Sequence, residues 1–289
     1  MGRVEDLRAR AERYAERAEV VRQNHRSVDA VVSMADRDIE IGGAIMAGAL
    51  AYRIFVWLLP FGLVLVGGIG VAADAADESS ASAANSLGLQ GIVSHSVAQA
   101  SGGSSRWYAI LIGIPILVWA SRGLLKALIV VHRLVWGDVR REVAKPTVGA
   151  TLRILLLFAT YFAIREGARG VESWTGSVVL STIFGLALVF LWWMLVSIRL
   201  PHHGAPWRAL VPGAVIIALG FELVADVGTH LIAPRISSSE SAYGALGVAA
   251  TLLLGLFIVS RLVVASAVVN ATAWERRSEP ESSPGTEVA

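Results

Sequence analysis

Four charged side chains and a histidine lie within long apolar stretches of this chain, where ionic groups are costly. They are Arg53, Glu222, Asp226, His230 and Arg261. A charge in the hydrocarbon core of a bilayer costs at least about 2.5 kcal/mol, so such residues usually pair with one another or mark a substrate or proton path. Arginine can bind an anionic headgroup, whereas carboxylates and histidine can relay protons.

The spacing of these residues predicts that they meet. Glu222, Asp226 and His230 follow one another at intervals of four, which places them on one face of a helix. From the rise of a helix, Arg53 lies roughly 14 Å, Glu222 about 20 Å and Arg261 roughly 12–16 Å from the cytoplasmic ends of their predicted spans. We therefore predict that the two arginines pair with Glu222 or Asp226. Three interpretations are open: structural ion pairs, a polar cavity that binds a headgroup or relays protons, and charges that extend to the membrane surface from helix ends.

The elements that must position these residues are predicted transmembrane helices. Of the 289 residues, 55% are hydrophobic and only 17% are charged, below the roughly 25% typical of soluble proteins. The mean hydropathy is +0.61. A hydrocarbon core about 30 Å thick needs roughly 20 apolar residues per helix, and no stretch alternates as a strand would. We predict an all-α polytopic integral membrane protein with six transmembrane helices at about 44–71, 107–128 (or on to 136), 148–164, 178–198, 209–232 and 245–269.

The transmembrane domain, residues 44–273, is flanked by two different regions. Residues 1–43 are predicted to form cytoplasmic amphipathic helices, because apolar residues recur every three or four positions from Val4 to Val21 and from Val28 to Ile39. A short coiled coil is an alternative for the first of these stretches. The second is predicted to lie in the interface as an elbow that leads into the first span. Residues 274–289, which are polar and contain proline, are predicted to be a disordered cytoplasmic tail.

Basic residues set the predicted orientation. Arginine and lysine gather after the second and fourth spans and in the C-terminal tail, whereas residues 74–105 contain neither. By the positive-inside rule, both termini face the cytoplasm, and the protein is predicted to be a multi-pass protein of the cytoplasmic (inner) membrane. The pI of 9.2 and net charge of +2 follow from arginines that flank the membrane and do not indicate a nucleic-acid partner.

Composition and motifs argue against an enzyme. With no cysteine, disulfides, thiolate nucleophiles, thiolate zinc sites and iron–sulfur clusters are excluded. Of the 6 histidines only His202 and His203 are close, and adjacent side chains point in different directions, so we expect no metal site. No zinc-protease, serine-hydrolase or phosphate-loop motif is present. We therefore predict a non-enzymatic protein without cofactors.

Prolines and small residues predict how the helices bend and pack. Pro60 and Pro115 fall inside apolar spans, remove helix hydrogen bonds and are predicted to kink their helices as hinges, or to be simply packed. Gly43, Ala47 and Ala51 recur every four residues, which allows close helix approach. Packing within one chain and dimerisation both fit this pattern, so the oligomeric state stays open.

The first apolar span resembles the N-terminal signature of the YihY/BrkB (YhjD-type) envelope integrity family, formerly labelled ribonuclease BN-like. The matching residues are Ala51, Tyr52, Phe55, Leu58, Leu59 and Pro60. The six-span plan, the long loop after the first span and the charged N-terminal region are also similar, so the resemblance covers about residues 25–275. It implies an inner-membrane protein linked to envelope integrity or virulence and to lipid export. Arg53 departs from the family pattern, which has a small or aromatic residue there.

Two functions follow from these patterns. The first is transport or flipping of a lipid or other amphiphilic envelope component, with membrane lipids as partners and an anionic lipid or amphiphile as substrate. The second is a non-transporting scaffold for envelope integrity, in which the intramembrane charges are structural. Transport predicts a water-accessible cavity that reaches Glu222 and Arg53, whereas a scaffold predicts that these charges are closed off and mutually saturated. No close pair of inverted repeats, which would favour a transporter, is evident.

Overall fold

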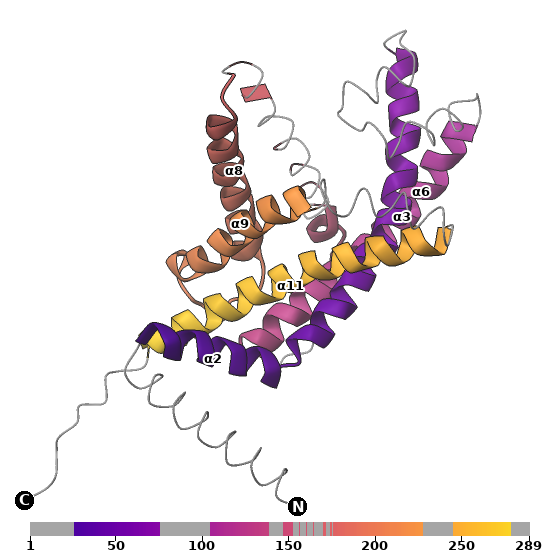
Figure 1. Cartoon of the computed structure of the whole chain (residues 1–289). Helices are drawn as coiled ribbons and strands as arrows, with labels where there is room; N and C mark the ends of the chain where they lie inside the picture. Colours follow the sequence, from indigo (N-terminus) through magenta and orange to yellow (C-terminus); the bar gives the residue numbers. More distant parts are fainter. Residues whose placement is uncertain are drawn as a thin grey trace, which may run out of the picture.

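A computed structural model of the chain describes residues 26–75, 105–138, 147–152, 176–227 and 245–278, with isolated positions between 156 and 174. All regular structure in these residues is helical (Figure 1), so the predicted all-α class is confirmed for this part of the chain. The elements are α2 (Arg26–Glu40), α3 (Gly43–Ala75), α6 (Ser105–Val135), α8 (Val178–Arg199), the 3-10 helix η1 (Trp207–Leu210), α9 (Val211–Val227) and α11 (Ala245–Ser278).

Five of the predicted spans are found as helices long and apolar enough to cross a membrane. They are Gly43–Leu65, Ile110–Val135, Val178–Arg199, Trp207–Val224 and Ala249–Ser278. Most of the predicted span at 148–164 lies outside the described residues, as do residues 1–25, so six spans and the first amphipathic stretch stay predictions. Helix α11 continues to Ser278, so residues 274–278, predicted to be disordered, are helical.

Helices α3 and α6 form an antiparallel pair (Figure 1). The Trp57 indole N–H donates to Ser121 Oγ at 2.8 Å, and the Ser121 hydroxyl donates to the Leu117 carbonyl at 2.6 Å. Farther along the pair, a Cβ on Gly113 would lie 2.7 Å from a methyl group of Val64, so the close approach of the two helices there requires glycine. These contacts fix the register of the pair.

Both predicted hinge prolines lie inside continuous helices. Pro60 is buried within α3, and Pro115 is exposed within α6. Neither residue ends its helix, and a role as hinges stays a prediction.

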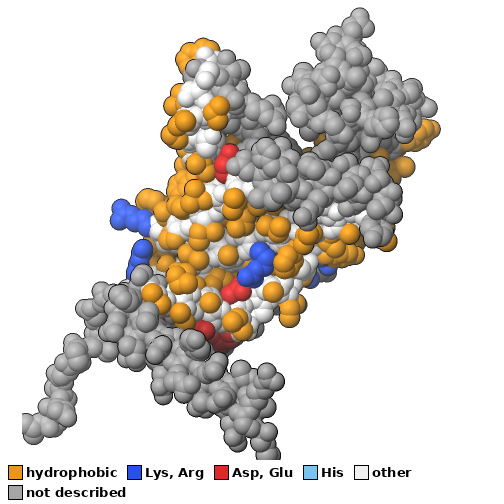
Figure 2. Space-filling view, viewed as in Figure 1, with side chains coloured by type: hydrophobic (Ala, Val, Ile, Leu, Met, Phe, Trp, Pro, Cys, Tyr) orange, Lys and Arg blue, Asp and Glu red, His pale blue; other side chains and the backbone are white. Residues whose placement is uncertain are grey.

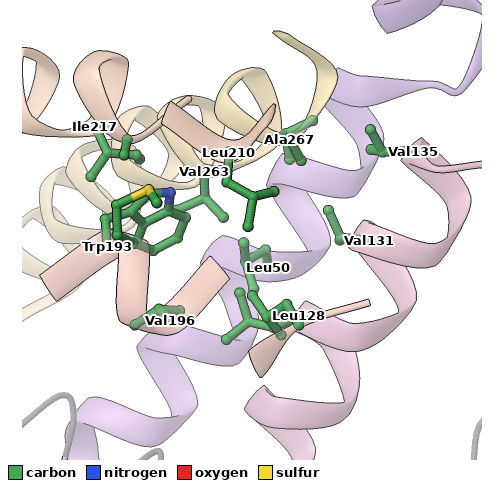
Figure 3. Close-up of a cluster of buried hydrophobic side chains, with 14 of the residues drawn as sticks. Leu50, Leu128, Val131, Val135, Trp193, Val196, Leu210, Ile217, Val263 and Ala267 are labelled. Atoms are coloured by element: carbon green, nitrogen blue, oxygen red, sulfur yellow. The ribbon is translucent and has the colours of Figure 1, made fainter. Parts of the chain in front are cut away.

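The hydrophobic core includes the C-terminal parts of α6 and α8, the middle of α11, and the junction of η1 with α9. Figure 3 shows buried apolar side chains from α3, α6, α8, η1, α9 and α11 converging there. Its labelled members are Leu50, Leu128, Val131, Val135, Trp193, Val196, Leu210, Ile217, Val263 and Ala267. Because α6 and α8 bring their C-terminal ends into one core, both helices end on the same side of the molecule.

Helix α2 packs against α11 and turns into α3. It ends at Glu40, and Gly42 in the following turn has a φ of +65°, a left-handed conformation that favours glycine. The apolar stripe predicted to lie in the interface is exposed in part: Val31 is 66% and Ile39 77% exposed, whereas Val28 and Val32 are half-buried. Charged side chains of α2 contact α11, and the placement of α2 in the membrane interface stays a prediction.

Candidate functional site

Arg261 forms a bidentate ion pair with Asp38. Its Nη1 donates to Asp38 Oδ1 at 3.0 Å and its Nη2 to Oδ2 at 2.9 Å, joining the middle of α11 to the end of α2. The two side chains are 34% and 21% exposed. Arg261 therefore pairs with Asp38 rather than with the predicted Glu222 or Asp226. The reason is that α2 runs along α11 and brings its own carboxylate to the guanidinium.

This pair lies beside the beginning of α3, where the first span starts. A Cβ added to Gly43, the first residue of α3, would overlap Asp38 Oδ1 and would lie 3.0 Å from Arg261 Nη1. The guanidinium is thus level with the beginning of α3. The three interpretations of the intramembrane charges stay predictions.

Further ionic contacts continue along α2. Arg37 pairs with Glu275 of α11, with 2.9 Å between Nη2 and Oε1. The Arg37 Nε also donates to the carbonyl oxygen of Val135, the last residue of α6, at 3.2 Å. Arg276 pairs with Asp29. We call the three pairs Asp38–Arg261, Arg37–Glu275 and Asp29–Arg276 the ionic clasp; it joins α2 to α11 and, through Arg37, to the end of α6.

Arg53 has a different environment. Its side chain is exposed on α3, midway along the span Gly43–Leu65. The guanidinium rests against α6, because a Cβ on Gly123 would lie 3.2 Å from Arg53 Nη1. Within the described residues Arg53 has no ion-pair partner, so the predicted pairing with Glu222 or Asp226 is not found there.

The predicted polar stripe on α9 is described only in part. Glu222 is half-buried on α9 and has an interaction partner. Asp226 belongs to the same helix, but its side chain lies outside the described residues, as does all of His230. The stripe of three residues therefore stays a prediction.

Sequence reasoning missed several charged residues. Arg122 and Lys126 lie within the apolar span Ile110–Val135, on either side of the Gly123 that Arg53 contacts. Lys126 is exposed, and Arg122 is partly exposed and has an interaction partner. The criterion that singled out Arg53, a charge inside an apolar stretch, applies equally to both. Asp38 carried no such signal, because its role depends on where α2 packs.

Buried polar groups in the core serve the fold. Asn270 of α11 accepts a hydrogen bond through Oδ1 from the backbone N–H of Gly213 at 2.7 Å, which satisfies a donor in the first turn of α9. The His132 ring contacts the Leu128 carbonyl oxygen through Nδ1 at 2.9 Å.

The described residues hold no group of three or more possible metal ligands. Figure 2 shows a largely apolar face with isolated charged groups.

An apolar pocket of about 600 Å³ lies along the N-terminal part of α6. It is lined by Trp107, Tyr108, Ile110, Leu111, Ile114 and Pro115. These residues carry no charge, so the pocket offers apolar contact and no ionic recognition. It lies on the opposite half of α6 from the Arg53 contact.

Comparison with known proteins identifies a family. A family model described as Virulence factor BrkB matches residues 40–288, which is most of the chain. No curated protein and no solved structure matches.

Proposed function

Because the chain belongs to the Virulence factor BrkB family, we propose that this multi-pass membrane protein moves an amphiphilic lipid of the cell envelope across the cytoplasmic membrane. The observation that carries the proposal is Arg53, an exposed cation midway along an apolar span without an ion-pair partner in the described residues. A charge kept at this depth is costly, and an anionic group that passes it would offset the cost. The proposal requires no covalent chemistry, metal or cofactor.

The proposed orientation has both termini on the cytoplasmic side of the inner membrane. The ion pair between Asp29 and Arg276 brings the beginning of α2 beside the end of α11, which supports a common side for the two ends. The arginines and lysines after α6 and α8 support the cytoplasm as that side.

The proposed topology includes a sixth crossing at 148–164. Residues near the C-terminal ends of α6 and α8 belong to one hydrophobic core, which supports a common side for these two ends. Helix α8 has 22 residues, so its first residue, Val178, lies about 33 Å from its end. The chain thus leaves α6 on one side and enters α8 on the other, which supports one crossing between them.

The proposal is tested by lipid movement between leaflets. Full-length protein is reconstituted into vesicles of phosphatidylcholine that carry fluorescent phosphatidylglycerol, and the label accessible to a membrane-impermeant quencher is followed over time. We expect faster exchange than in protein-free vesicles, and about tenfold slower protein-dependent exchange after Arg53→Gln, since a hydrogen bond to a charged group contributes about 1.5–3 kcal/mol. Arg276→Gln, at the membrane edge, is the matched control. Exchange no faster than in protein-free vesicles would reject transport of this lipid.

The ionic clasp favours a second candidate function, a non-transporting scaffold for envelope integrity. Arg261, predicted as part of a transport site, is saturated by Asp38, as the structural interpretation requires. A scaffold predicts that clasp variants disturb envelope integrity while Arg53→Gln does not. The two candidates are separated by measuring detergent sensitivity of cells that carry each variant at equal protein level.

A further inference from the structure

We propose that Arg53 and Lys126 form a transit site for the phosphate group of an anionic phospholipid, on the lipid-facing surface where α3 meets α6. This inference rests on the proposed transport function and names its substrate class. Both side chains are exposed, and neither has an ion-pair partner within the described residues. Two uncompensated cations in an apolar surface therefore face the hydrocarbon region.

The helix register brings the two cations together. Trp57 bonds to Ser121 and the Arg53 guanidinium rests on Gly123, so these contacts follow the antiparallel course of α3 and α6. Gly123 and Lys126 are three residues apart on α6 and are neighbours on one helix face. The absence of a side chain at Gly123 leaves the guanidinium against the helix backbone, one turn from Lys126.

The surroundings favour a lipid over a soluble anion. Trp119 of α6, one turn before Gly123, is 67% exposed. An apolar surface of this kind suits acyl chains, while the two cations suit a phosphate through charge-assisted hydrogen bonds. A soluble anion would interact with the charges but would gain nothing from the exposed Trp119 ring on the same helix.

The depth of the site indicates transit. Arg53 is ten residues from the beginning of α3 and Lys126 is nine from the end of α6, which corresponds to about 15 Å and about 14 Å along the helices. These distances are close to half of a hydrocarbon core about 30 Å thick. Resting headgroups lie at the boundary of the core, so a phosphate meets these cations only while it crosses.

Native mass spectrometry tests the site. Full-length protein is released from nanodiscs that contain phosphatidylcholine and phosphatidylglycerol, and retained phosphatidylglycerol is counted for wild type and for Arg53→Gln/Lys126→Gln. We expect about tenfold weaker retention in this variant. Retention should stay at the wild-type level in Arg199→Gln/Arg208→Gln, which removes two exposed arginines, one at the end of α8 and one within η1. Equal retention in all three proteins, or equal loss in both variants, would overturn the site.

A second variant distinguishes loss of the site from misfolding of the double variant. Gly123→Val keeps both charges but displaces the guanidinium, and it should weaken retention, whereas Gly62→Val should not, because a Cβ at Gly62 would meet nothing within 4 Å. Displacement of the bound lipid by excess inorganic phosphate would overturn the assignment to a lipid. If the double variant loses lipid retention but the wild-type protein moves no lipid in vesicles, the binding site is supported and transport is rejected. If the double variant exchanges lipid at the wild-type rate, transport is supported and the transit site is rejected.

Discussion

Arg261 and Arg53 are two arginines in apolar helices, and the structure gives them opposite environments. Arg261 reaches the entrance of the first span, where Asp38 satisfies both ends of its guanidinium. Arg53 lies ten residues farther along α3, exposed, with the backbone at Gly123 as its contact. The sequence presents the two alike, as single cations within apolar stretches.

This difference separates an arginine that stabilises the fold from one that is available to bind a ligand. An ion pair with bidentate geometry neutralises a charge and orders two helices, so removing one partner should destabilise the protein. A cation without a partner in an apolar span lowers the unfolding free energy, so removing it should stabilise the protein. The same change should abolish the binding of any ligand that depends on the cation. Opposite signs of the change in unfolding free energy therefore distinguish the two arginines.

The largest effect is expected when the clasp loses its carboxylate. Asp38→Leu leaves Arg261 unpaired at the membrane edge and should lower the unfolding free energy by about 2–3 kcal/mol, below the range for fully buried pairs because both side chains are partly exposed. Unfolding in detergent, followed by circular dichroism, measures it. The exchanged pair Asp38→Arg/Arg261→Asp should recover part of the loss. Wild-type stability in Asp38→Leu would mean that the pair contributes nothing.

A smaller loss is expected from crowding the same pair. Gly43→Val introduces a side chain that overlaps the Asp38 carboxylate and should cost about 1–2 kcal/mol by the same measurement. Gly48→Val is the control, since a Cβ at Gly48 would meet nothing within 4 Å. An equal loss of unfolding free energy in Gly43→Val and Gly48→Val would mean that the loss reflects helix propensity and not the crowding of the ion pair.

Removal of the unpaired arginine should act in the opposite direction. Arg53→Leu should raise the unfolding free energy by about 1 kcal/mol, because leucine is favoured over a charge in an apolar span. The same variant should lose phosphatidylglycerol retention. A decrease in stability comparable with that of Asp38→Leu would assign Arg53 to the fold and weaken the comparison.

The smallest effect is expected at the outer end of the clasp. Arg276→Gln removes the pair with Asp29, whose partners are 32% and 30% exposed, and should cost about 0.5 kcal/mol. This loss should shrink further in high salt, because exposed charges are screened. A salt-independent loss larger than that of Gly43→Val would reverse the order proposed for the clasp.

The helices could be predicted from the sequence because length and apolar composition decide whether a segment can span a membrane. Five predicted spans overlap helices of this kind, although α11 continues nine residues beyond the predicted end at 269. The C-terminal end of α11 was placed too early, since Glu275, Arg276 and Arg277 are charged but extend the helix along α2.

The pairing of charges could not be predicted in the same way. Asp38 and Arg261 are 223 residues apart, and only the packing of α2 on α11 makes them neighbours. Lys126 was readable in principle, because it lies in an apolar span like Arg53. The relation between Lys126 and Arg53 depends on the register of α3 and α6, which no local pattern specifies.

The ionic clasp also sets an order in the biogenesis of the protein. Asp38 emerges from the ribosome long before Arg261, and at about 5–20 residues per second the interval is on the order of ten to forty-five seconds. During this interval the carboxylate of α2 can be satisfied only by water, lipid headgroups or a temporary partner. A nascent chain that stops before α11 cannot close the clasp, so α2 would dock in its final place only after the last helix has been inserted.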